Sequence, residues 1–313
     1  MSLSLSSRIA IAALATTFLV SAASANTPQA SQGQKSFSSA REAAHALADA
    51  VQSGNEQAMM EIFGPDGKEL VSSGDPEEDK QGRDQFSQKY QEMHRLVKEP
   101  DGTVTLYIGA ENWPFPIPLV QSSGSWHFDT DAGKQEVLFR RIGRNEIATI
   151  EVCHELVEAQ KEHFKGAHPG EAGEYAQKFS ADQGAHNGLY HAVTSGEPEI
   201  GPLLAEASAD AGQSESQPFH GYYFRILTRQ GSGAPGGAKD YVVDGKLTRG
   251  FAFVAFPAQY KSSGVMTFVV NQDGVVYQKD LGPDTNAAAR AILEYNPESS
   301  WQKAEGDNQQ SSQ

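Results

Sequence analysis

Cysteine and long apolar runs are the two features that this chain of 313 residues most lacks. Cys153 is its only cysteine, so no internal disulfide can form and the fold must depend on its packed core. After the first 25 residues no run approaches the about 20 apolar residues that a membrane-spanning helix needs. Cys153 lies in a helical pattern and is predicted to be a small buried residue; a catalytic thiol and an intermolecular disulfide are the alternatives.

Basic residues are also scarce. The chain has 25 Lys and Arg against 40 Asp and Glu, which gives a formal net charge of −15 at pH 7. Because nucleic-acid binding needs clustered positive charge, this balance argues against a nucleic-acid partner and against adhesion to anionic lipid. The length allows one large domain or two ordinary ones, each with its own core.

The N-terminus has a pattern typical of a secretory signal peptide. Arg8 is the only charge before an apolar run over residues 9–25, which ends in the small residues Ala-Ser-Ala. Cleavage is therefore expected before Asn26. A retained membrane anchor is the alternative, but the run is short for a span. No cysteine follows the cleavage site, so we expect no lipid anchor and a soluble protein in the periplasm or outside the cell.

Composition and periodicity divide the chain into five parts. The segment after the signal peptide is rich in Ser, Gln and Thr, which is typical of disorder. We expect a signal peptide at residues 1–25 and a disordered linker at residues 26–36. An N-terminal α+β domain is expected at residues 37–132, a C-terminal domain at residues 133–297 and a flexible tail at residues 298–313.

The N-terminal domain is expected to begin with helices and continue with strands, the order of an α+β fold. Two helices are predicted within residues 38–63, capped by Ser38 or Ser39 and by Asn55. An exposed loop is expected next at residues 72–84, followed by a helix at residues 84–97. A short antiparallel meander follows, with strands at residues 103–108, 115–121 and 126–129.

The C-terminal domain is expected to consist of one long helix and a four-stranded antiparallel sheet. Helical spacing runs from about residue 133 to residue 165, and a Gly- and Pro-containing segment ends it. Residues 174–218 mix short helical pieces with loops. The four strands are expected at residues 222–228, 251–256, 265–270 and 275–279, and a last helix at residues 283–295.

Four segments carry a family resemblance. They are ENWPFPIP at residues 111–118, RRIGRNE at 140–146, HGYYFRILT at 220–228 and GVMTFVVNQDGVVYQKDLG at 264–282. Together they resemble the bacterial exported family called domain of unknown function 2950, over nearly all of the mature chain. This family has no assigned activity, so the resemblance does not imply one.

The C-terminal half also resembles the globular head of a type IV pilin or pseudopilin. Such heads have a long helix that begins near an Asn-Glu pair, here Asn145-Glu146, followed by a variable region and an antiparallel sheet. A pilin polymerises through an exposed apolar helix, whereas this helix follows a folded domain and carries Arg140, Arg141 and Arg144. The resemblance therefore implies a pilin-like head and not a pilus subunit. The N-terminal half is similar, at fold level only, to nuclear-transport-factor-2 and cystatin-like folds.

Three pairs of residues are candidate binding residues. Trp113 and Phe115 alternate with prolines, which predicts a sheet edge or a polyproline-like arm with aromatic surface; packing against its own domain is the alternative. Arg140 and Arg144 lie four apart on one helix face, spaced to bind a carboxylate or phosphate, or else to pair with an internal acid such as Glu136.

The third pair is His220 and Tyr222, at the start of a predicted strand. These side chains are candidates to line a groove, and packing in the core is the alternative.

Patterns for catalysis and metal binding are weak. No Gly-x-Ser-x-Gly elbow occurs. His154 and Glu158 share a helix face, but His163 falls half a turn away and cannot join them, so a solvated face is predicted. Two fragments that resemble calcium loops lack the glutamate at the twelfth position. We therefore expect no catalytic residue, no metal and no cofactor.

These observations favour a non-catalytic envelope protein that binds another envelope protein. A hydrolase and a carrier of a small ligand are the alternatives, each with its site in a pocket of the N-terminal domain.

Overall fold

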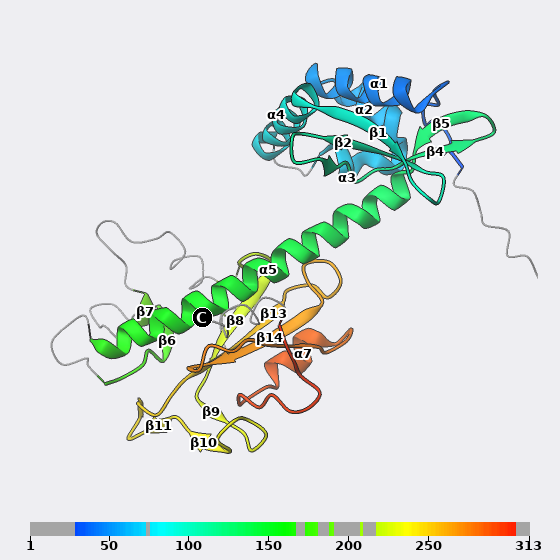
Figure 1. Cartoon of the computed structure of the whole chain (residues 1–313). Helices are drawn as coiled ribbons and strands as arrows, with labels where there is room; N and C mark the ends of the chain where they lie inside the picture. Colours follow the sequence, from blue (N-terminus) through cyan, green and yellow to red (C-terminus); the bar gives the residue numbers. More distant parts are fainter. Residues whose placement is uncertain are drawn as a thin grey trace, which may run out of the picture. The chain divides into compact units, whose positions relative to one another are not determined.

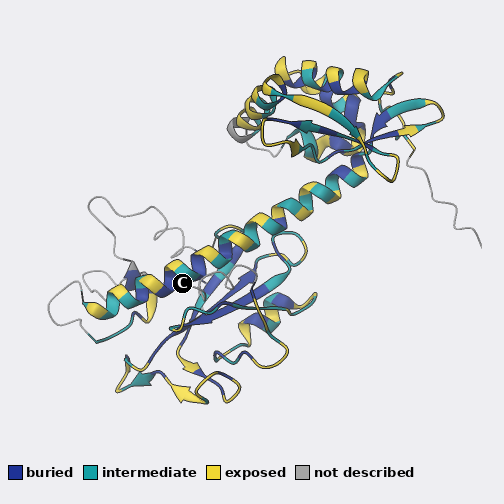
Figure 2. Ribbon diagram, viewed as in Figure 1, coloured by how far each residue is buried: buried dark blue, intermediate teal, exposed yellow. Residues whose placement is uncertain are grey.

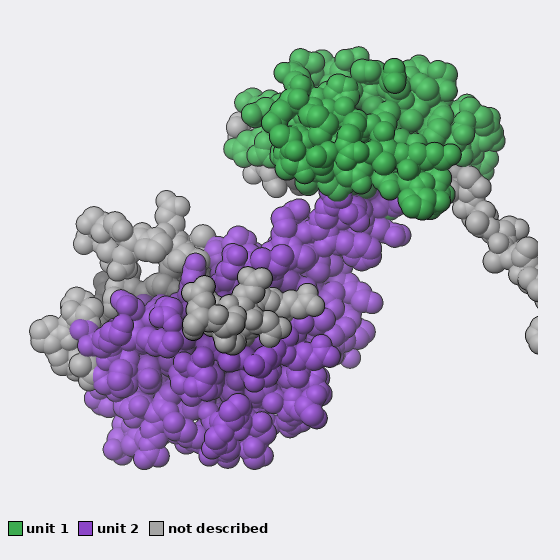
Figure 3. Space-filling model, viewed as in Figure 1, with its two compact units in different colours: residues 1–131 green, residues 132–313 purple. Residues whose placement is uncertain are grey.

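The computed structural model describes residues 29–72, 76–166, 173–180, 188–190, 207–208 and 217–304 (Figure 1). The predicted signal peptide and the end of the expected C-terminal tail lie outside the described residues. The chain divides into two compact units, residues 1–131 and 132–313 (Figure 3).

Capped helices open the first unit. Ser39 caps α1 by accepting a hydrogen bond from the Glu42 amide at 3.1 Å. Asn55 caps α2 by accepting from the Ala58 amide at 3.0 Å, so both expected caps are confirmed. The helical elements are α1 (Ala40–Gln52), α2 (Glu56–Phe63), the 3₁₀ turn η1 (Pro65–Gly67), α3 (Lys68–Val71) and α4 (Pro76–Glu92).

An antiparallel sheet in the order β1-β2-β4-β5 completes the first unit, and β3 pairs with β2. Its strands are β1 (His94–Lys98), β2 (Val104–Ile108), β3 (Trp113–Pro114), β4 (Leu119–Ser122) and β5 (Ser125–Phe128). Leu47 of α1 and Ile62 of α2 share one buried cluster with Leu119 and Phe128. Figure 2 shows the buried parts of the helices and strands in dark blue. The helices and the sheet therefore enclose a common apolar core.

The helix expected over residues 84–97 is wrong at its C-terminal end, because residues 94–98 form β1. The cause is the tight hairpin that follows. Gly102 takes a φ of 92°, which suits glycine, and the Glu99 amide donates to the Thr103 carbonyl at 2.9 Å. This hairpin returns the chain onto β2 and draws the residues before it into the sheet.

The exposed loop expected over residues 72–84 is also wrong for residues 76–84, which belong to α4. Pro76 stands at the first helical position, where its missing N–H has no partner to lose.

Part of the segment expected to be a disordered linker is bonded to the first unit. The Lys35 amide donates to the Glu61 carbonyl at 2.7 Å. The Gln34 side-chain amide donates to the carbonyls of Ile62 at 3.0 Å and Phe128 at 2.7 Å. Residue 34 therefore joins the end of α2 to the end of β5.

One long helix and an antiparallel sheet build the second unit. Helix α5 (Thr130–Lys165) buries Val152, Cys153, Leu156 and Val157 in the same cluster as the sheet. The sheet has the order β16-β15-β14-β13-β8, with strands β8 (Tyr222–Leu227), β13 (Ala252–Pro257), β14 (Met266–Asn271), β15 (Tyr277–Asp280) and β16 (Gln302–Lys303). The α+β class predicted from the sequence is confirmed.

Two expectations for the end of the chain need correction. The sheet has a fifth strand, because residues 302–303 of the expected flexible tail pair with β15, and Ala304 is fully buried. The last helix is only α7 (Thr285–Arg290), which packs against β13. The remaining short strands are β6 (Lys178–Ser180), β7 (Gly188–Tyr190), β9 (Arg229–Gln230), β10 (Lys239–Asp240), β11 (Val242–Val243) and β12 (Lys246–Leu247).

The Asn145-Glu146 pair attaches α5 to the chain between β13 and β14. Glu146 accepts hydrogen bonds at one carboxylate oxygen from the amides of Val265 at 2.8 Å and Met266 at 3.0 Å. Asn145 donates to the Ser263 carbonyl at 2.9 Å. Hydrogen bonds to a carboxylate are stronger than neutral ones, so this pair fixes the helix on the sheet.

Within the part of the chain that the structure describes, no helix is both long enough and apolar enough to cross a membrane.

Gly264 lies where α5 and the sheet approach closely. A Cβ there would overlap the Tyr222 hydroxyl, which is fixed by its 3.0 Å bond to the Met266 carbonyl. We expect Gly264→Ala to lower the free energy of unfolding of the second unit by about 2 kcal/mol. Gly143→Ala is the control: no atom lies within 4 Å of its Cβ, and alanine in a helix is expected to raise stability by about 0.5–1 kcal/mol. Denaturant unfolding with hydrogen exchange of β13 and β14 measures both, and equal stability of the two variants would contradict the packing described.

His127 makes the stability of the first unit depend on pH. Burial lowers the pKa of its imidazole below the ordinary 6.5, while Asp129 opposes part of this shift. The unfolded chain then binds more protons than the folded one, so stability is complete above pH 6.5 and falls as pH drops below that value. We expect His127→Gln to flatten this dependence between pH 5 and 7 (about the range in which histidine titrates), as measured by hydrogen exchange of β4 and β5. An unchanged slope would show that another group is responsible, and His220→Gln, in the second unit, is the control.

Candidate functional site

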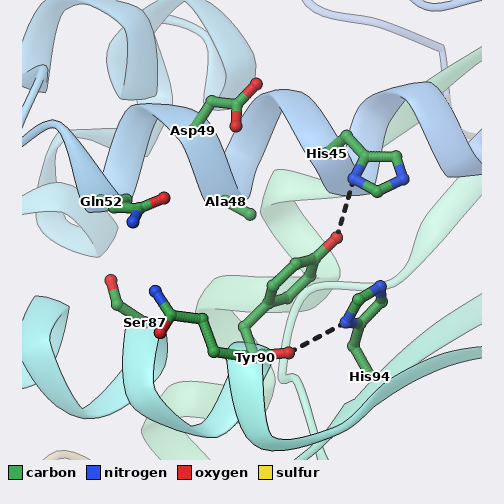
Figure 4. A pocket seen from close by; sticks show the side chains of 8 residues that line it. His45, Ala48, Asp49, Gln52, Ser87, Tyr90 and His94 are labelled. Atoms are coloured by element: carbon green, nitrogen blue, oxygen red, sulfur yellow. Dashed lines mark hydrogen bonds between the residues drawn. The ribbon is translucent and has the colours of Figure 1, made fainter.

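Three side chains of the first unit, His45, Tyr90 and His94, come together on its surface (Figure 4). His45 lies on α1, Tyr90 in the last turn of α4, and His94 at the first position of β1. Tyr90 is buried, whereas both histidines are exposed. The change from helix to strand between residues 92 and 94 brings the His94 ring onto Tyr90.

The contacts within this cluster fix the orientation of all three rings. The His94 ring stacks on the Tyr90 ring with centroids 4.0 Å apart and planes 4° apart. His94 Nδ1 lies 2.9 Å from the Tyr90 carbonyl oxygen, which can only accept, so Nδ1 carries a proton. The Tyr90 hydroxyl lies 3.2 Å from Nδ1 of His45. The two imidazoles meet edge to face with centroids 6.0 Å apart.

The Tyr90 hydroxyl is protonated at neutral pH. Burial, and next the charge of Asp49, raise its pKa above the ordinary 10. A protonated hydroxyl can donate a hydrogen bond or accept one, so its bond with Nδ1 of His45 forms with either neutral tautomer of the imidazole.

Two hollows open beside this cluster. The larger one, about 390 Å³, lies between α1 and β1, and the smaller, about 180 Å³, lies between α1 and α4. The cluster borders both. Arg41, Ala44, His45, Tyr90, His94, Arg95 and Leu96 line the larger, and His45, Ala48, Asp49, Gln52, Ser87, Tyr90, Gln91 and His94 line the smaller.

The larger hollow is cationic. It contains two arginines and two histidines, and none of its described lining residues is acidic. Arg95 is fixed by a 2.8 Å hydrogen bond from Nε to the Asn112 side chain and lies over the Tyr107 ring at 4.5 Å. Among the described residues no acid forms an ion pair with Arg41 or Arg95, so both guanidinium groups are available to an anion.

The chemistry of these residues suits binding of an anion better than metal binding or catalysis. In the described part of the chain, no three His, Cys, Asp or Glu side chains are grouped to hold a metal ion. Among the described residues that line the smaller hollow, Ser87 is the only one besides Tyr90 with a hydroxyl, and it makes no side-chain hydrogen bond to either histidine. A hydrolytic nucleophile needs such a bond to a base.

The six residues predicted as candidates lie elsewhere. Trp113 and Phe115 belong to the proline-rich segment, which pairs with β2 and packs against its own domain instead of projecting as an arm. Phe115 contacts Phe86 and Phe128 at ring distances of 5.4 Å and 6.2 Å, and only Trp113 is exposed. Internal packing, the stated alternative, describes this segment.

Arg140, Arg144, His220 and Tyr222 all lie in the second unit. Arg140 donates from Nε to Glu136 at 2.7 Å, the internal pairing that was the alternative to ligand binding, while Arg144 is exposed. His220 is exposed, with a φ of 48°. Tyr222 is fully buried and therefore cannot line a groove. Cys153 is buried in the core, as expected for a small apolar residue.

Sequence reasoning missed the cluster for an identifiable reason. Assigning residues 84–97 to one helix placed His94 on the same helix as Tyr90 instead of at a strand end. The available signal was the spacing of two pairs, Arg41 with His45 and Tyr90 with His94, each four residues apart. Such spacing is common on solvated helices, so it does not identify a site without the fold.

The fold and this hollow define a two-unit α+β protein with a cationic site on its first unit. Comparison with known protein families matches residues 34–304 to the family described as protein of unknown function, DUF2950. The chain therefore belongs to this family, and the resemblance seen in its sequence is confirmed. No curated protein and no solved structure matches the chain, so the likeness to pilin heads and to cystatin-like folds stays a prediction.

Tyr90→Phe tests the geometry of the cluster. The variant keeps the ring that stacks on His94 and removes the hydrogen bond to His45, so the free energy of unfolding is expected to fall by only about 1 kcal/mol. The ¹⁵N chemical shift of His45 Nδ1 should change, whereas that of His94 Nδ1, bonded to a backbone carbonyl, should not. An unchanged His45 signal would contradict the hydrogen bond.

Proposed function

We propose that this protein is a non-catalytic binding protein of the bacterial cell envelope, and that its first unit binds an anionic group of its partner between α1 and β1. The observation that carries the proposal is the composition of the larger hollow. Arg41, Arg95, His45 and His94 gather there without an acid among its described lining residues, in a chain of net charge −15. Export is inferred from the signal-peptide pattern of residues 1–25.

The positive charge of the larger hollow requires a balancing negative charge. Cations brought together repel one another, and an acidic side chain in their midst would relieve that repulsion. Arg41 and Arg95 form no ion pair among the described residues, so their charge is balanced by solvent or by a bound anion. Arginine presents two parallel N–H donors that match a carboxylate or a phosphate, which makes these the groups the site suits.

The hydrolase alternative has less support. Tyr90 keeps its proton and is engaged with His45, so it is a poor nucleophile. The small-ligand carrier differs from the proposal only in the molecule that is bound. A free dicarboxylate and a carboxylate of a partner protein would use the same hydrogen-bond donors. Both readings place the ligand in the same hollow.

Titration with succinate and with inorganic phosphate tests the proposal on the purified chain. We expect saturable shifts of the His45 and His94 imidazole signals in NMR spectra. Arg41→Gln and Arg95→Gln should each weaken binding about tenfold, since each removes charge-assisted hydrogen bonds. Lys68→Gln on α3 is the matched control, because it removes an exposed charge of the same unit outside the hollow.

Two results would count against this function. If neither anion shifts the histidine signals, or if Lys68→Gln weakens binding as much as the arginine variants do, the hollow is not an anion site. Conversion of a chromogenic ester or phosphoester that Arg95→Gln abolishes would favour the hydrolase.

A further inference from the structure

Strand β1 is at the edge of its sheet, and its outer side is unpaired in the described structure. The hydrogen-bond pattern shows which backbone groups face outward. The Glu99 amide bonds to the Thr103 carbonyl, and the Gly109 amide bonds to the Met93 carbonyl, each at 2.9 Å. In an antiparallel pair the bonded positions alternate, so Arg95 and Val97 also face β2.

The intervening residues, His94, Leu96 and Lys98, therefore direct their N–H and C=O groups away from β2. No described residue bonds to these groups through its backbone. An unpaired strand edge is a template for pairing with another extended chain.

The larger hollow lies along this edge. Successive side chains of a strand point to opposite faces of a sheet. His94, Arg95 and Leu96 are consecutive, yet all three line the hollow, so it follows the edge of the strand and is not confined to one face. Leu96 packs toward the helices, whereas Arg95 lies over Tyr107 on the other face.

The charges select the occupant of this edge. A second copy of β1 would bring Arg95 and Lys98 of both chains together, and like charges on an edge strand oppose such pairing. An acidic segment would instead meet Arg95 on one face of the sheet and Arg41, His45 and His94 on the helix side. An extended segment with carboxylates on both of its faces fits this distribution.

We propose that the ligand is an extended, acidic peptide segment of a partner protein, which adds to β1 as a further strand with its carboxylates on Arg41 and Arg95. This proposal rests on the proposed function, since it specifies the molecule that carries the anionic group. Main-chain hydrogen bonds to Leu96 and its outward-facing neighbours supply affinity, and the arginines supply selectivity for acidic sequences.

The probe is the blocked six-residue peptide EVEEVE, with two N-methylated versions that carry equal numbers of methyl groups. Methyl groups on peptide positions 3 and 5 block one edge of the extended peptide and leave the other free. Methyl groups on positions 3 and 4 block both edges. We expect the first version to bind within about threefold of the parent peptide and the second to bind at least about tenfold more weakly, because pairing to β1 needs one intact edge.

The protein gives an independent readout. In the free chain, the amides of Arg95 and Val97 should exchange slowly and those of His94, Leu96 and Lys98 quickly. The peptide should slow the second set alone. The neutral peptide QVQQVQ should bind the protein at least about tenfold more weakly than EVEEVE does. The Arg41→Gln and Arg95→Gln variants should each bind EVEEVE at least about tenfold more weakly than the unmodified protein does. The Lys68→Gln variant should bind EVEEVE as tightly as the unmodified protein.

The outcomes separate the two proposals. If succinate binds but the two methylated peptides bind alike, or exchange at β1 does not change, strand addition is overturned and the anion site stands. If neither succinate nor EVEEVE binds, the proposed function fails. If the chain forms dimers through β1 that EVEEVE does not dissociate, the edge belongs to a second copy and the peptide proposal is wrong.

Discussion

The hairpin between β1 and β2 is the constraint on which the site of the first unit depends. Asp101 accepts hydrogen bonds from the amide and the hydroxyl of Thr103 at 2.9 Å and 2.8 Å, and Gly102 supplies the positive φ of the turn. This turn sets the register of β1. A slip of one residue would exchange the faces of Leu96 and Arg95 and remove His94 from the Tyr90 ring. Packing, charge and the open backbone edge thus share one local cause.

The second unit depends on a different device, a carboxylate that binds backbone amides. Glu146 holds the start of β14 against α5, and the Tyr222 side chain of β8 leaves room only for glycine at residue 264. Burial and the Glu146 charge raise the pKa of Tyr222, so its hydroxyl stays protonated and bonded to the strand. The residues that carried the family resemblance here therefore have a structural role in joining helix and sheet.

The sequence predicted those features that local chemistry determines. The caps at Ser39 and Asn55, the long helix and the main strands of the second unit each follow from residues adjacent in sequence. The sequence prediction failed where pairing with another strand determines the structure. Residues 94–98 form a strand because β2 pairs with them, and residues 302–303 join the sheet because β15 offers a partner. The site was missed because its side chains on α1 are more than forty residues away in sequence from those on α4 and β1.

The single cysteine gives the molecule a built-in reporter. Cys153 lies fully buried beneath the sheet of the second unit, and the first unit contains no thiol at all. A thiol reagent can therefore react only when α5 separates from that sheet, so the labelling rate measures opening of the second unit alone. Thiol labelling of the unmodified chain therefore measures the stability of the second unit separately from that of the first.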